Sequence, residues 1–193
     1  MRRLRIFEHI SLDGVIQNSR DENDFPYPDW SASYRTPAGL DATLAAHGER
    51  FDLLLGRRTY DLWSGFWPKA PSTPLGDRLN AATKYVATHR PESLAWGPFG
   101  GLGSDLVEGT RRLKAQEGPD LILWGSSTLT STLLASGLAD EVLLIVYPVL
   151  VGTGKRFFVE GTPARSLELV NTKATPTGVL LNTYKVAGPL KAG

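Results

Sequence analysis

The chain has 193 residues, of which 41% are hydrophobic and 21% charged, and its formal net charge is +1. This composition is typical of a globular domain with a sizeable core, and nothing in it indicates binding to nucleic acid or to a membrane surface. There is no cysteine, and the three histidines are far apart in the sequence, so disulfides and thiolate catalysis are excluded and no metal is expected. No apolar run reaches the roughly 18 residues of a membrane span, and we expect a cytoplasmic location.

In chain order, the hydrophobic pattern alternates strands with helices. Short apolar runs predict strands over residues 4–10, 51–55, 84–87, 120–124 and 141–147. Helical spacing and stop signals predict helices over residues 39–48, 57–63, 74–81, 105–115 and 127–136. Two longer runs, 166–172 and 179–186, predict an antiparallel hairpin, and the end after Gly188 is expected to fray. We therefore expect one domain over residues 1–193, an α/β fold with a mostly parallel sheet and an antiparallel edge.

Four segments have the character of places where a phosphate-bearing ligand contacts backbone: residues 11–16, 55–60, 87–90 and 123–128. Three follow an apolar run, and two of these pass directly into a helical pattern. At the end of a parallel strand, such a turn exposes amide N–H groups and a helix N-terminus to an anion. Four such segments in one chain indicate a nucleotide cofactor.

The second of these segments is the most informative. Gly56 at a strand end lets the backbone approach a ligand, Arg57 and Arg58 can grip phosphate, and Thr59 adds a hydroxyl. The alternative is a helix cap followed by two surface arginines.

The last segment, Gly125-Ser126-Ser127-Thr128, begins the helix after a central strand. Nested backbone amides at such a turn can hold a pyrophosphate. Simple N-capping by Ser126 or Ser127 is the alternative.

The third segment, Thr88-His89-Arg90, ends a shorter strand and could contact the far end of a dinucleotide. Arg90 near Arg57 would favour a 2′-phosphate, and therefore NADPH over NADH. A surface turn is equally compatible with these three residues.

Acid–base candidates are few. Glu8 and His9 in the first strand are the ones placed near the expected site, although a strand histidine is more often a hydrogen-bonded core residue. Asp13-Gly14, just after this strand, is either an ordinary tight turn or the base of a loop that closes over a nicotinamide.

These motifs together resemble the dihydrofolate-reductase-like superfamily, and most closely small proteins related to the C-terminal reductase domain of bifunctional riboflavin-biosynthesis deaminase–reductases. The resemblance covers nearly the full length and rests on the order and spacing of residues 11–14, 54–60, 67–68, 123–126, 137–141 and 148–154. It implies a three-layer α/β/α fold, NADPH as hydride donor and a homodimer.

The resemblance also implies roles for individual residues. It places Arg57, Arg58 and Thr59 on the cofactor phosphates, residues 88–90 around the adenosine and residues 125–129, which end at Leu129, on the pyrophosphate. Val15 and Ile16 would lie near the nicotinamide. The first helix offers only Asp41 where the folate enzymes carry a carboxylate, and Ser126 replaces the second of their paired glycines, so folate is disfavoured as the substrate.

The expected function is an NADPH-dependent reductase of a small heterocycle of the pteridine or aminopyrimidine type. Hydride transfer needs little from a protein beyond orienting the ring and excluding water. The aromatic residues expected around the substrate are Tyr27, Trp30, Trp63 and Trp67, with core packing as the alternative for the tryptophans. The competing hypothesis is a non-catalytic protein that binds a dinucleotide or another phosphorylated ligand.

Overall fold

The computed structural model describes residues 1–19 and 24–190. Its strands and α-helices are β1 (Leu4–Ser11), α1 (Pro37–His47), β2 (Phe51–Gly56), α2 (Arg57–Phe66), α3 (Pro74–Ala81), β3 (Lys84–Ala87), α4 (Leu106–Ala115), β4 (Asp120–Trp124), α5 (Ser127–Ala135), β5 (Glu141–Tyr147), β6 (Arg165–Ala174) and β7 (Leu180–Pro189). All the strands and helices expected from the sequence are present. Short 3-10 helices that the sequence did not predict lie in the connections: η1 (Ala32–Tyr34), η2 (Trp67–Lys69) and η3 (Pro91–Ser93).

Capping side chains account for small differences at the helix ends. Helix α1 begins two residues earlier than predicted, because Thr36 Oγ1 accepts a hydrogen bond from the Gly39 amide at 3.1 Å and Pro37 occupies the first turn. Asp105 is the N-cap of α4 rather than its first residue, since its carboxylate accepts from the Glu108 amide at 2.9 Å.

One seven-stranded sheet runs through the molecule in the order β3-β2-β4-β1-β5-β7-β6. The five strands from β3 to β5 are parallel, whereas β7 pairs antiparallel with β5 and β6 antiparallel with β7. The predicted mostly parallel sheet with an antiparallel C-terminal hairpin is confirmed. Pairing in β7 continues to Pro189, the first residue of the end that was expected to fray, and residues 191–193 lie outside the described residues.

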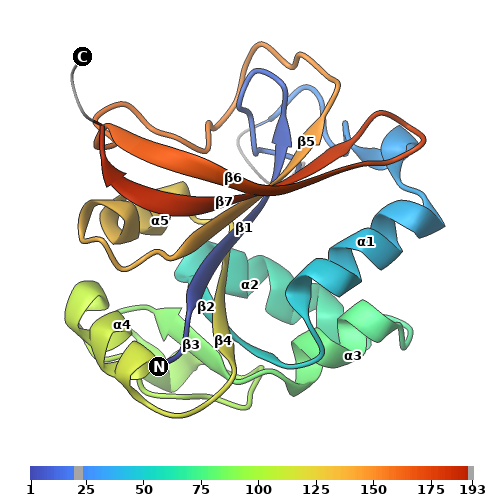
Figure 1. The fold of residues 1–193 in the computed structure, drawn as a ribbon. Coiled ribbons are helices and arrows are strands. Elements are labelled where there is room, and N and C mark those ends of the chain that lie inside the picture. The colour runs from blue at the N-terminus through green and yellow to red at the C-terminus, as the bar shows by residue number, and fades with distance from the viewer. Residues whose placement is uncertain (20–23, 191–193) are drawn as a thin grey trace.

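Helices cover both faces of the parallel strands (Figure 1). On one face, Ala42 of α1, Tyr60 of α2 and Leu79 of α3 join a buried cluster with the sheet. On the other face, Leu113 of α4 and Leu133 of α5 join a second cluster. These layers are the expected α/β/α arrangement. No helix in the described part of the chain is long and apolar enough to cross a bilayer.

The strand order creates a switch point between β1 and β4. The chain leaves β1 through α1 on one face, and it leaves the neighbouring β4 through α5 on the opposite face. In open α/β sheets a crevice forms at the carboxyl ends of two such strands, and ligands bind there. A ligand site is therefore expected at this edge of the sheet.

Candidate functional site

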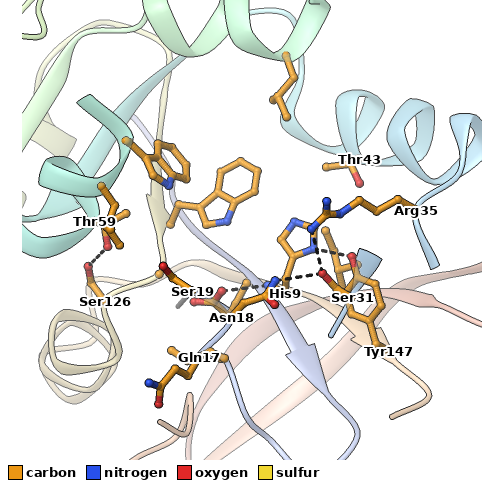
Figure 2. A pocket seen from close by; sticks show the side chains of 18 of the residues that line it. His9, Gln17, Asn18, Ser19, Ser31, Arg35, Thr43, Thr59, Ser126 and Tyr147 are labelled. Carbon is orange, nitrogen blue, oxygen red and sulfur yellow. Dashed lines mark hydrogen bonds between the residues drawn. The ribbon is translucent and has the colours of Figure 1, made fainter. Parts of the chain in front are cut away.

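A cleft of about 1250 Å³ opens at the carboxyl ends of the parallel strands. Its walls include Glu8 and His9 of β1, Gly56 at the end of β2, and Trp124 and Gly125 at the end of β4. Figure 2 shows the hydrogen-bonded pair of Thr59 and Ser126 on one side of the pocket and His9, Arg35 and Tyr147 on the other. Segments far apart in the sequence thus share one cavity.

The turns at Gly56 and Gly125 are in direct contact. The Gly56 amide donates to Ser126 Oγ at 3.2 Å, and the hydroxyls of Thr59 and Ser126 are 3.1 Å apart. A Cβ at position 56 would lie 2.4 Å from Ser126 Oγ, so only glycine fits this approach. Two of the segments that the sequence assigns to ligand contact therefore meet in the folded protein.

The turn before α5 has an unusual backbone. Gly125 and Ser126 both have positive φ, at 69° and 61°. A non-glycine residue in this region is strained, and such strain is concentrated at functional sites. Ser126 makes no capping hydrogen bond to α5, which removes N-capping as an explanation for its presence. Ser127 does not line the cleft: its side chain is fully buried behind the turn.

Arg57 connects two of the predicted segments. Its Nε lies 2.8 and 2.9 Å from the Asp61 carboxylate oxygens, and its Nη1 donates to Ser93 Oγ at 2.6 Å. The same Nη1 lies 3.3 Å from Thr88 Oγ1 and 3.4 Å from the Arg90 carbonyl. The residues from Thr88 to Arg90 therefore lie beside Arg57, just outside the cleft lining, whereas Arg57 and Arg58 line it.

The segment at Asp13 is a tight turn, in which the Gly14 amide donates to the Ser11 carbonyl at 3.0 Å, and Asp13 also anchors a second segment. The Asp13 carboxylate accepts from Ser11 Oγ at 2.6 Å and from the amides of Val151 and Gly152 at 3.1 and 2.8 Å. These hydrogen bonds, that from Ser11 foremost, lower the pKa of Asp13 to about 2. The segment after β5 is thereby held against residues 11–17.

Beside this turn, the expectation for Val15 is corrected. Ile16 lines the cleft, but the neighbouring Val15 is fully buried in a β-bridge with Arg156 and faces the interior. Because side chains alternate along an extended segment, only one of the two can face the cleft.

The two β1 candidates have opposite environments. Glu8 is 5% exposed, and burial raises the pKa of its carboxyl to about 8. Burial, together with the charge of Arg35, lowers the pKa of His9 to about 4. His9 Nδ1 is 2.8 Å from the Tyr147 hydroxyl, and its ring stacks on Trp124 with centroids 5.8 Å apart. Both groups are uncharged at neutral pH.

The third acid–base candidate, Asp41, does not face the cleft. Asp41 is exposed, and α1 instead presents Leu40 and Thr43 to the cavity. Successive helix residues differ in direction by about 100°, so the phase fixed by the Thr36 cap turns position 41 away.

The aromatic prediction holds in part. Trp63 and Trp67 line the cleft. Trp30 does not: it packs edge-on against Tyr147 at 5.4 Å and donates Nε1–H to the Gln17 carbonyl at 2.7 Å, so it supports the wall from behind. Tyr27 is 53% exposed and contacts Phe25 outside the cavity.

Several lining residues were missed from the sequence. They include the aromatic and basic side chains Arg35, Phe66, Trp124, Tyr147 and Lys155. Trp124 is the last residue of β4 and Tyr147 the last residue of β5. Their positions at the ends of buried strands were the sequence signal that could have identified them as lining residues. Nothing local marked Arg35 or Lys155.

The arrangement of the sheet and its helices defines the class of fold, which is dihydrofolate-reductase-like. A dihydrofolate reductase from Enterococcus faecalis, solved with NADP(H), superposes with a TM-score of 0.61 at 19% identity, over 96% of each chain. The reductase–deaminase of Thermotoga maritima, a 5-amino-6-(5-phosphoribosylamino)uracil reductase, superposes with a TM-score of 0.63 at 14% identity, over 96% of this chain and 57% of that one.

The sequence itself identifies the family. The RibD C-terminal domain model matches residues 2–181, and the chain belongs to this family. YyaP of Bacillus subtilis (strain 168) is 28% identical over 187 residues, which are 95% of this chain and 94% of that protein. The resemblance stated from the motifs is thereby confirmed.

Proposed function

We propose that this protein is an NADPH-dependent reductase that transfers hydride to a small heterocycle of the pteridine or aminopyrimidine type. The observation that carries the proposal is the contact between the Gly56 and Gly125 turns at the carboxyl ends of parallel strands, beside Arg57 and Arg58. The cavity exceeds the roughly 300–1,000 Å³ of an ordinary ligand pocket, which suits a dinucleotide and a second ring together.

The residues present fit such a cofactor. The backbone at Gly125 and Ser126 opens the N-terminus of α5 toward the cleft, where it would hold the pyrophosphate with Thr128 and Leu129. Arg57 and Arg58 would hold the phosphate at the adenosine end, close to residues 88–90. When bound, the reduced nicotinamide supplies the hydride. The Enterococcus faecalis dihydrofolate reductase, which was solved with NADP(H), and the 5-amino-6-(5-phosphoribosylamino)uracil reductase of Thermotoga maritima support this choice.

The chemistry required of the side chains is orientation and exclusion of water. Trp63, Trp67 and Trp124 provide flat apolar walls for an aromatic ring. His9 stays neutral, and its hydrogen bond to Tyr147 fixes its ring, so it can present a polar atom to the substrate.

The charges of the cleft bear on the substrate. Arg35, Arg57, Arg58 and Lys155 line it, whereas the carboxyl among its lining residues, Glu8, is neutral at neutral pH. An aminopyrimidine carrying a phosphate suits this balance better than a pterin that is bound through an ionised carboxylate.

The test is consumption of NADPH, followed by its absorbance, with a panel of pterins, phosphoribosylated aminopyrimidines, flavin precursors and quinones. Oxidation of NADPH with a member of the heterocycle panel supports the proposal. Tight NADPH binding without turnover on any compound would favour a non-catalytic dinucleotide-binding protein, and failure to bind NADPH would overturn both.

A further inference from the structure

The pairing of β1 with β4 ends where the cleft begins. β1 pairs with β4 from Leu4 to Phe7 only, but it pairs with β5 as far as Ser11. The Arg3 carbonyl accepts from Leu121 of the β4 side, so the backbone groups of odd-numbered β1 residues face β4. The His9 amide therefore points into the gap beside β1 that opens beyond its last pair with β4, Phe7 with Trp124.

Glu8 occupies that space with its own side chain. Its Oε1 accepts a hydrogen bond from the His9 amide at 3.0 Å. Its Oε2 is buried and has no hydrogen-bond partner among the described residues. This oxygen lies 3.8 Å from the position that a Cβ of Gly125 would take, in the wall of the cleft. A buried polar atom without a partner is costly, so Oε2 is suited to a partner that a ligand brings.

The strand order indicates which part of the ligand arrives there. From the sheet edge inward, Thr88 follows β3, Gly56 ends β2 and Gly125 follows β4. Next comes Glu8 of β1, one residue beyond the last pair that β1 forms with β4. Three interstrand spacings of about 4.8 Å cover about 14 Å, comparable to an extended dinucleotide. With the adenosine phosphate near Arg57 and the pyrophosphate at the α5 N-terminus, the remaining end of the cofactor is the nicotinamide.

We propose that Glu8 binds the nicotinamide end of the cofactor, with its protonated Oε2 donating a hydrogen bond to the carboxamide oxygen. This inference rests on the proposed function and assigns a recognition residue within it. The carboxamide oxygen is an acceptor, which is the group that a neutral carboxylic acid can satisfy.

The surroundings of Glu8 favour the neutral acid. Around it, α2 presents the Thr59 hydroxyl, the β4–α5 turn presents Gly125 with Ser126, and the charge that acts on it is that of Lys155. Burial outweighs the His9 amide and Lys155, both of which lower the pKa, so the pKa stands near 8. The acid form dominates at neutral pH and is lost as the pH rises through this value. Affinity for NADPH should therefore fall in alkali.

The test compares NADPH with 2′-phospho-ADP-ribose, which lacks the nicotinamide, by calorimetric titration of the whole protein. Glu8→Ala should weaken NADPH about tenfold, as expected for one buried hydrogen bond, and leave 2′-phospho-ADP-ribose within about twofold. Glu8→Gln keeps a neutral donor and should bind NADPH nearly as the wild type does. Thr110→Val is the matched control, because Thr110 Oγ1 is also buried without a partner in the described part of the chain but lies in α4, away from the cleft.

The pH dependence separates recognition from a structural role. Wild-type affinity for NADPH should fall about tenfold between about pH 7 and about pH 9, relative to that for 2′-phospho-ADP-ribose, whereas Glu8→Gln should show no such relative change. Equal weakening of both ligands by Glu8→Ala, or no weakening of either, would overturn the assignment. If neither ligand binds the wild type, the proposed function fails as well; if both bind and the Glu8 variants do not discriminate between them, only this inference fails.

Discussion

Gly56→Ala is the substitution whose effect follows most directly from the site. Its φ of −72° suits alanine, so the backbone adds no strain. The new Cβ would lie 2.4 Å from Ser126 Oγ and 3.2 Å from Ser126 Cβ. Relief requires the Ser126 hydroxyl to move, which breaks its hydrogen bonds to the Gly56 amide and to Thr59. Overpacking and the lost hydrogen bonds together predict that the free energy of unfolding falls by about 2 kcal/mol.

Ser126→Gly provides the matched background. It removes both clashing atoms, and glycine suits the φ of 61° at this position. Gly56→Ala should then cost less than about 0.5 kcal/mol, which leaves a coupling energy of about 1.5 kcal/mol in the double-mutant cycle. The coupling energy is measured by urea denaturation, followed by circular dichroism, of the wild type, the two single variants and the double variant. Costs that add to within about 0.5 kcal/mol would refute the contact between the two turns.

Three other predictions concern separate parts of the molecule. Arg57→Ala should weaken the binding of NADPH more than that of NADH in fluorescence titrations, since it removes a charge at the adenosine end. Equal losses of affinity for the two cofactors would show that Arg57 does not bind the 2′-phosphate. Burial lowers the pKa of His47 to about 3 in the folded protein, whereas a histidine in the unfolded chain has a pKa of about 6.5. Between these two pH values the unfolded chain binds more protons, so the free energy of unfolding should fall as the pH is lowered from about 6.5 toward about 3. His47→Phe should reduce that slope in urea titrations, and an unchanged slope would contradict the assignment. We also propose a homodimer through the exposed edge strand β6, where Leu169 and Val170 are 54% and 59% exposed. Val170→Lys should lower the mass measured by light scattering to that of a monomer. A wild-type protein that is already monomeric would refute the proposed dimer.

The regular elements were predictable because glycine, proline and capping residues mark their ends. The strands at 84–87 and 120–124 and the helix at 74–81 have the expected bounds. The glycine-turn part of the site was also predictable, since the carboxyl ends of parallel strands meet at one edge of the sheet. The proximity of Gly56 and Gly125 could be predicted without knowing how any helix is rotated or which path any loop takes.

The rest of the site depends on geometry that a local pattern does not contain. Tyr147 reaches His9 only because β1 and β5 pair in the register that sets Ser11 opposite Tyr147. The rotation of α1 decides that Thr43, and not Asp41, faces the cavity. Lys155 arrives on a loop that is held by its contacts with residues 11–17, including a hydrogen bond from its amide to Gln17.

The most direct measurement is a crystal structure of the protein with NADPH. We expect the pyrophosphate at the first turn of α5, beside Gly125 and Ser126, the adenosine toward Arg57, and the nicotinamide in the gap between β1 and β4. A cofactor bound elsewhere, or a pyrophosphate remote from both Gly56 and Gly125, would contradict the proposed site.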